Sequence, residues 1–179
     1  MLKIYAQLAY NNLFANHRLL RAAERLQSGE FEAKGVSFFP SIKKTLNHNI
    51  TVDWYYVDAF EGGSLGAKAW ENEEPFADAT ALKAAQREVD LRLIKFCDQL
   101  REDALPKMVK LLRYEEPLGN ALPHLFQHQI HHRGQAHAMF AGTSIAPPQL
   151  DEFMFRVDHA EREKDLAELG LVETDLPAY

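Results

Sequence analysis

Histidine is concentrated in one short stretch of this sequence. Five of the eight histidines lie between residues 124 and 137. His128 and His132 are four residues apart, so on a helix they share one face, with their Cβ atoms about 6 Å apart. The same face carries an apolar stripe, formed by Ala121, Leu125 and Met139. We therefore expect both imidazoles to point into a helical bundle, where two nitrogens can converge on one metal ion.

The histidine pair alone supports two interpretations, a pair of hydrogen-bonded core residues or a pair of metal ligands. Neighbouring buried imidazoles compete for partners and repel one another when protonated, whereas a metal ion binds the neutral nitrogens of both. Gln129 follows His128 where an HEXXH motif needs glutamate, and the Glu-x-x-His motifs of di-iron bundles are also missing. These absences favour a single ion held by histidines.

A mononuclear site needs a third protein ligand, preferably from another helix. The histidines outside the cluster are His17, His48 and His159. His48 lies in the middle of a predicted helix, on a face of small and weakly apolar side chains that suits helix packing. We expect the other histidines outside the site, at the surface (His17, His159), on the opposite helix face (His137) or at its margin (His124, His131). His48 is the preferred third candidate, and no residue is assigned as a general base.

Apolar residues at spacings of three and four predict the helices that position these side chains. The four long helices cover residues 4–27, 41–60, 78–100 and 118–141. Asp78 or Thr80 is the expected N-cap of the third helix, and Pro123 fits the fourth helix only within its first turn. Residues 107–114 are expected to be extended or partly helical. The fold class is all-α, a four-helix bundle with a short helical C-terminal extension near residues 158–169.

The charge is unevenly distributed along the chain. The net charge is −6, and residues 150–179 carry all of it, with nine acidic and three basic side chains, while residues 1–149 hold 17 of each. We expect residues 1–150 to form the bundle domain and residues 151–179 an acidic extension, packed on that domain or trailing from it. A chain of this charge is not expected to bind a nucleic-acid backbone.

Other features indicate the compartment and the redox chemistry. No apolar run approaches the roughly 18 residues of a membrane span, and the N-terminus lacks a secretory signal pattern, so we expect a cytoplasmic protein with no membrane partner. The lone Cys97 excludes an internal disulfide and a thiolate metal cluster. It lies in the apolar run LIKFCDQL and is expected to be a buried packing residue. Thiol chemistry would therefore need an external thiol.

Three segments together resemble the DinB superfamily of four-helix-bundle metal proteins: TLNHNITVDWYY, HQIHHRGQAH and NNLFAN. The resemblance implies that His48, His128 and His132 are the ligands of one metal ion. It also implies a motif of the form HxxxHRGQ, which Arg133, Gly134 and Gln135 complete. The resemblance extends from about residue 8 to residue 151 and leaves the acidic tail uncovered.

Further polar side chains are candidates for roles around such a site. Gln135 falls near His128 on the helical wheel and is placed to hydrogen-bond a ligand or a substrate. Tyr55 lies close to the face of His48 and can donate to a bound anion. For both residues, ordinary packing or capping is an equal alternative. Arg133 is expected to form a salt bridge.

The implied site leads to an expected chemistry. Three neutral histidines leave one divalent ion, zinc, nickel or iron, its full charge and an open position, which lowers the pKa of a bound water or small thiol. We expect a metal-dependent enzyme that acts on a small-molecule substrate, as a transferase using a low-molecular-weight thiol or as a hydrolase. The alternative is a metal-containing stress-response binding module without turnover, and a third hypothesis is a bundle with adventitious metal. Helix bundles of this size also commonly form homodimers.

Overall fold

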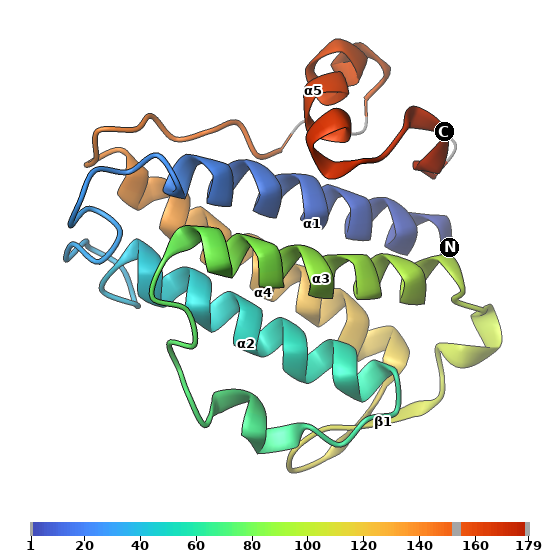
Figure 1. The fold of residues 1–179 in the computed structure, drawn as a ribbon. Coiled ribbons are helices and arrows are strands. Elements are labelled where there is room, and N and C mark those ends of the chain that lie inside the picture. Colours follow the sequence, from blue (N-terminus) through green and yellow to red (C-terminus); the bar gives the residue numbers. More distant parts are fainter. Residues whose placement is uncertain (1, 152–154, 178–179) are drawn as a thin grey trace.

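Helices account for most of the structure. The computed structural model describes residues 2–151 and 155–177. The body consists of α1 (Leu2–Ala23), α2 (Ile42–Phe60), α3 (Ala79–Asp98) and α4 (Leu118–Phe140), and α5 (His159–Leu169) follows near the C-terminus (Figure 1). The short elements are η1 (Gly66–Trp70), η2 (Glu102–Ala104), β1 (Met108–Lys110), β2 (Glu115–Pro117), η3 (Arg156–Asp158) and η4 (Glu173–Asp175). The all-α fold class predicted from the sequence is confirmed.

The starts of two bundle helices are fixed by side-chain caps. The Ser41 hydroxyl accepts the N–H of Lys44 at 3.1 Å, and Asp78 accepts the N–H of Ala81 at 2.8 Å. Each cap satisfies one of the backbone donors that a helix leaves free in its first turn. Asp78 is therefore the N-cap of α3, as one of the two sequence alternatives predicts.

None of the described helices combines the length and the apolar composition that a membrane span requires.

Pro123 departs from the sequence prediction, because it lies inside α4 beyond the first turn. A proline lacks the N–H that would bond to the carbonyl of Gly119, four residues earlier. The helix continues through this position since the turns around it bury apolar side chains: Ala121, Leu122, Leu125 and Phe126. The gain from packing that stripe offsets the loss of one backbone hydrogen bond.

The segment before α4 forms a hairpin. Strands β1 and β2 pair antiparallel, with Val109 opposite Glu116, so of residues 107–114 the extended alternative holds for 108–110, while 111–114 form the turn. A lone hairpin is marginally stable in water and needs something to pack on. Here the Tyr55 hydroxyl of α2 accepts the N–H of Leu112 at 2.6 Å, which fixes the hairpin turn to the bundle.

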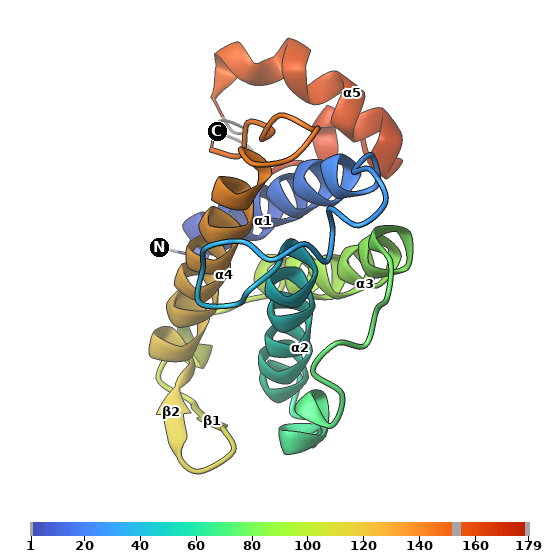
Figure 2. The same cartoon turned by 90° about the vertical axis from the view of Figure 1, so that its left-hand side faces the viewer.

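The four bundle helices pack as two pairs, α1 with α3 and α2 with α4 (Figures 1 and 2). Apolar side chains with less than 2% of their surface exposed fill the centre: Leu13, Phe14, Leu19, Ile42, Ile50, Leu82, Leu93, Leu122, Leu125 and Phe140. Burial of this area is the main favourable term in the stability of such a bundle.

A polar network crosses this apolar core around Arg133 of α4, whose side chain is almost fully buried. Its guanidinium donates to the side-chain oxygens of Asn12 and Asn16 on α1, at 3.0 Å for Asn16. The two asparagines in turn donate to Asp90 of α3, each at 3.0 Å. The NNLFAN segment of the sequence therefore supplies two bridges between α3 and α4.

A second buried carboxylate joins the same network. Gln86 of α3 donates to Asp53 of α2 at 2.7 Å and to Asp90 at 3.1 Å, and Gln129 of α4 also donates to Asp53. Burial raises the pKa of Asp90 to about 6, while burial and the nearby Asp90 raise that of Asp53 well above its ordinary value. Burial lowers the pKa of Arg133 to about 10, so the guanidinium stays charged at neutral pH. Arg133 is thus one cation near two carboxyl groups. The charges balance when Asp90 is ionised and Asp53 keeps its proton.

The acidic tail is joined to the bundle by ion pairs. In both views α5 lies beside α1 (Figures 1 and 2). Asp165 accepts from Arg18 at 2.5 Å and pairs with Arg21 at 3.0 Å. Arg87 of α3 donates to the carbonyl of Leu169 at 2.7 Å. Basic side chains of the bundle thereby offset part of the charge of the tail.

The network predicts unequal effects for its two carboxylates. Asp90→Asn removes the ionised group that balances Arg133, so we expect the free energy of unfolding to fall by about 3 kcal/mol. Burial and the nearby Asp90 raise the pKa of Asp53 well above its ordinary value, so we expect Asp53→Asn to replace a protonated carboxyl group and to cost about 1 kcal/mol. Urea denaturation at pH 7 measures both values. Equal losses for the two variants would contradict the assignment of the proton to Asp53.

Candidate metal centre

The three histidines selected from the sequence come together between two facing helices. His48 lies in the middle of α2, and His128 and His132 lie on successive turns of α4. The ring centre of His48 is 5.0 Å from that of His128 and 4.7 Å from that of His132, and the last two are 4.5 Å apart. The pairing of α2 with α4 therefore places all three imidazoles around one point.

The donor atoms of the triad are close enough for one ion. Nε2 of His48 lies 3.1 Å from Nε2 of His128, and one ring nitrogen from each of the three histidines lies within 4.8 Å of the others. Two nitrogens that bind the same tetrahedral zinc at about 2.1 Å are about 3.4 Å apart. The residues present thus fit a single divalent ion with histidine ligands.

All three imidazoles are neutral at physiological pH. Burial, with a smaller contribution from His132, lowers the pKa of His48 to about 4. Burial and the neighbouring histidines lower the pKa of His128 to about 3, and burial lowers that of His132. Metal ions bind the neutral form of imidazole. The surroundings therefore favour metal binding, because an ion does not compete with a proton that would make these side chains cationic.

Gln135 fixes the tautomer of His132. Its side-chain oxygen lies 2.9 Å from Nδ1 of His132, and its amide nitrogen lies 2.9 Å from Nε2 of His131. With the amide oxygen accepting from Nδ1–H, the lone pair of His132 is left on Nε2, which is available to an ion. Of the two sequence alternatives for Gln135, the structure shows the contact with a candidate ligand. Nδ1 of His128 is buried without a hydrogen-bond partner in the described part of the chain.

The direction of the histidine pair differs slightly from the sequence prediction. Gln129 and Arg133, one residue farther along α4, face the bundle interior and are 0% and 5% exposed. His132 is 8% exposed, and His128 is only half-buried. Ala121, Leu125 and His132 of the predicted stripe are buried, but the centre of the buried face is rotated by roughly 60° from it, and the histidines face the α2 side of the bundle.

The remaining histidines lie outside the triad. His124 and His131 are exposed, His137 lies 2.8 Å from the carbonyl oxygen of Pro148, and His159 is exposed as predicted. The prediction of a surface position for His17 is wrong, because it is 7% exposed and its Nε2 lies 2.9 Å from a carboxylate oxygen of Glu168. The tail covers it, and that contact joins residues 151 positions apart, which local sequence patterns do not reveal.

Three further predictions have mixed outcomes. Cys97 is a buried packing residue as expected, with a pKa raised to about 12 by burial. The Tyr55 hydroxyl accepts the N–H of Leu112 on the hairpin turn, so the packing role is seen, while donation to an anion stays a prediction. Arg133 makes no direct salt bridge within the described residues, because two asparagines lie between it and Asp90.

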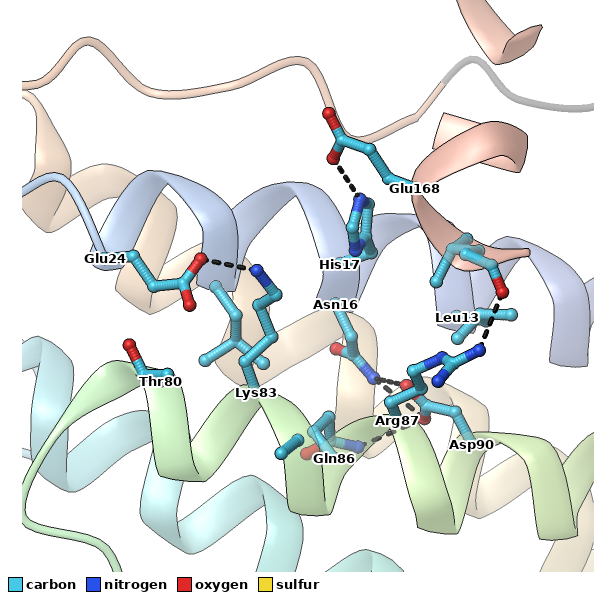
Figure 3. Close-up of a pocket in the computed structure, with 13 residues that line it drawn as sticks. Leu13, Asn16, His17, Glu24, Thr80, Lys83, Gln86, Arg87, Asp90 and Glu168 are labelled. Carbon is cyan, nitrogen blue, oxygen red and sulfur yellow. Dashed lines mark hydrogen bonds and ion pairs between the residues drawn. The ribbon is translucent and has the colours of Figure 1, made fainter. Parts of the chain in front are cut away.

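His17, Asp165 and Glu168 form a second cluster whose ligand atoms lie within 4.8 Å of one another. It borders a pocket of about 530 Å³ between α1, α3 and the tail (Figure 3). Both carboxylates are already paired with arginines, Asp165 with Arg18 and Arg21, and Glu168 with Arg21 at 2.7 Å. Fixed cations next to the oxygens oppose a metal ion, so this cluster is a docking contact of the tail.

Two pockets open onto the histidine triad. One, of about 330 Å³, reaches His48 and is lined by Lys44, Thr51, Glu73 and Glu74 together with aromatic rings. The other, of about 320 Å³, reaches His128. Trp70 lines both pockets, and the ring centre of Phe39 lies 4.3 Å from that of His48. These two aromatic residues were not selected from the sequence, because they lie in connecting segments without periodicity.

Comparisons with known proteins agree on one family. The model of the DinB family matches residues 1–164. The protein named DinB from Bacillus subtilis is 26% identical over 160 residues, which cover 80% of this chain and 90% of that protein. A crystal structure of a DinB-like protein from Bacillus subtilis superposes with a TM-score of 0.57 at 16% identity, covering 82% of this chain and 99% of the other. A DinB-like protein from Bacillus cereus gives 0.56 at 15% identity, with coverages of 76% and 91%.

The lowered pKa values predict that the buried histidines of the metal-free protein contribute a loss of stability in acid. An unfolded chain binds protons at histidine near the ordinary pKa of 6.5, whereas folded His48 and His128 bind them only at about pH 4 and about pH 3. His48 and His128 therefore lower the free energy of unfolding as the pH drops from about 6.5 toward 4.5, while Asp53 and Asp90, whose pKa values burial raises, act in the opposite direction. Urea denaturation in the presence of a chelator measures this slope.

A pair of variants controls that measurement. His128→Gln removes one of the buried imidazoles, so its free energy of unfolding should fall less than that of the wild type between about pH 6.5 and 4.5. Gln127→Ala changes an exposed neighbour on the same helix and should leave the slope unchanged. A slope that His128→Gln does not alter would show that this imidazole is not held neutral by the fold.

Proposed function

The chain belongs to the DinB family, and we propose that it is a metal-dependent enzyme in which His48, His128 and His132 hold one divalent transition metal ion. The observation that carries the proposal is the convergence of three neutral imidazoles from two facing helices beside open pockets. Neutral imidazole is a good ligand for zinc, nickel and ferrous iron. Three such ligands leave at least one coordination position for water or a substrate.

Several residues of this chain have distinct roles at such a site. A bound ion supplies a Lewis acid that lowers the pKa of a coordinated water or thiol. Gln135 holds the ring of His132 in one orientation and one tautomer. Phe39 packs on His48 and shields one side of the triad from solvent. The buried surroundings keep the ligands deprotonated.

The reaction that we propose is the transfer of an external low-molecular-weight thiol to a small electrophile, or the hydrolysis of a small molecule. The only cysteine cannot supply the sulfur, because Cys97 is buried and its pKa is raised to about 12. A thiol nucleophile would therefore have to come from a cosubstrate. The two pockets beside the triad offer space for a substrate and for such a cosubstrate.

The same geometry disfavours a binding module without turnover. Such a module would close its site with a fourth protein ligand, for which His124 and His131 are the nearest candidates in sequence. His131 instead contacts Gln135, and neither residue belongs to the group of converging donor atoms. The pockets leave the triad accessible to small molecules, which is the arrangement of a catalytic metal site.

The proposal predicts which substitutions abolish metal binding. Alanine at His48, His128 or His132 should weaken zinc binding by at least about 100-fold, because each change removes one of three ligands. His17→Ala, in the second cluster, should keep the wild-type affinity and serves as the matched control. Elemental analysis of untagged protein and competition with a chelator measure the metal content and the affinity.

Metal loading should also stabilise the fold. Zinc at about a thousand times its dissociation constant should add about 4 kcal/mol to the stability, seen as a higher midpoint of thermal unfolding. The loaded protein is then assayed for thiol transfer and ester or amide hydrolysis. Unchanged metal binding in the triad variants, or its loss only in His17→Ala, would contradict the site.

A further inference from the structure

The pocket beside His128 is built mainly from aromatic side chains. It is lined by α2, by the hairpin turn between β1 and β2, by Trp70 of η1 and by α4. The ring centre of Tyr55 lies 4.6 Å from that of Trp70 and 5.0 Å from that of Tyr56. Tyr56 in turn lies 5.7 Å from the ring of His124. The half-buried ring of Trp70 and the small exposed parts of Tyr55 and Tyr56, 7% and 8% exposed, therefore form aromatic walls for a planar guest.

The hairpin turn completes the pocket and is held in place. The hydrogen bond from Leu112 to the Tyr55 hydroxyl ties the turn to α2. Leu112 and Tyr114 line the pocket and remain 51% and 58% exposed. A guest in the pocket would cover part of this apolar surface without requiring the backbone to move.

The charge of the pocket favours an anion. Arg113 is the one charged side chain among its lining residues, and no carboxylate of the described residues lies within ion-pair distance of it. No acidic residue lines this pocket. The pocket on the His48 side differs, since there Lys44 lies 3.3 Å from Glu74 and is already paired. A guanidinium without a partner at an apolar pocket is suited to a carboxylate.

From these observations we propose that the pocket beside His128 binds a small aromatic carboxylate, with its ring among Tyr55, Tyr56 and Trp70 and its carboxylate at Arg113. The volume of about 320 Å³ accommodates a molecule of the size of phenylacetate. Arg113 is exposed and His128 is half-buried, so the ring enters toward the triad while the charged group stays at the mouth. The role of this ligand as a substrate rests on the proposed metal-dependent function.

Three related ligands test the assignment on the full chain. Phenylacetate has both features, cyclohexylacetate lacks the aromatic ring, and phenylacetamide lacks the charge. A ligand of this size is expected to bind with a dissociation constant of about 1 mM. We expect phenylacetate to bind about tenfold more tightly than cyclohexylacetate and about fivefold more tightly than phenylacetamide.

Heteronuclear NMR measures these affinities and locates the ligand. The chain has two tryptophans, so their indole N–H signals form an internal comparison. The signal of Trp70, which lines the pocket, should shift with phenylacetate. The signal of Trp54, whose ring packs 5.8 Å from that of Phe76 and does not line the pocket, should move far less.

Two exposed substitutions separate the contributions. Arg113→Gln should remove the preference for phenylacetate over phenylacetamide, and Tyr114→Leu should weaken phenylacetate about threefold while keeping an apolar side chain. Arg25→Gln removes the same charge from an exposed position outside the pocket and should have no effect. Both pocket positions are exposed, so the variants should retain the wild-type fold, which circular dichroism checks.

The results distinguish this assignment from the proposed function. Equal affinity for phenylacetate and cyclohexylacetate, equal effects of Arg113→Gln and Arg25→Gln, or no Trp70 shift at about 10 mM ligand would overturn it. Metal content is measured on the same preparations. A protein that binds metal but not phenylacetate retains the proposed function and loses this assignment. A protein that binds phenylacetate but no metal keeps the ligand pocket and loses the role of the ligand as a substrate.

Discussion

The buried charge of Arg133 is the constraint on which the rest of the bundle depends. A guanidinium that is 5% exposed is tolerated only where its charge is balanced and its N–H groups are bonded. Asn12, Asn16 and the two carboxyl groups of the network meet that need from three other helices. Any rotation or sliding of α4 would break all of these hydrogen bonds together. The network therefore fixes the rotation and the height of α4 against its neighbours.

That fixed rotation determines where the candidate ligands point. On α4, two polar pairs with the same spacing lie one residue apart: His128 with His132, and Gln129 with Arg133. Side chains one residue apart differ by about 100° around a helix, so locking one pair to the core directs the other toward α2. His48 of α2 lies opposite the histidine pair, with 3.1 Å between the Nε2 atoms of His48 and His128. The core network and the candidate metal centre are thus two consequences of one helix orientation.

These relations explain what the sequence predicts and what it does not. Apolar spacing and cap residues such as Asp78 reveal the helices, because both signals are local, and the spacing of His128 and His132 reveals two of the three members of the triad. The predicted inward stripe omits Gln129 and Arg133, because both look like surface side chains until their partners on other helices are known. His17 and Glu168 meet only after the tail has docked, and Phe39 and Trp70 reach the triad from segments with no periodic pattern.

The helices carry the candidate metal ligands, whereas the connecting segments shape the pockets beside them. The triad sits on α2 and α4, which the core network holds rigid, so its geometry does not depend on the loops. Connecting segments complete the walls of both adjoining pockets: the segment before α2 and η1 with the residues after it in one, and η1 and the hairpin turn in the other. Trp70 belongs to both pockets, so two molecules bound there would approach each other beside the same ring and the same three imidazoles. The scaffold can therefore keep one candidate metal centre while changes in three short segments alter what reaches it.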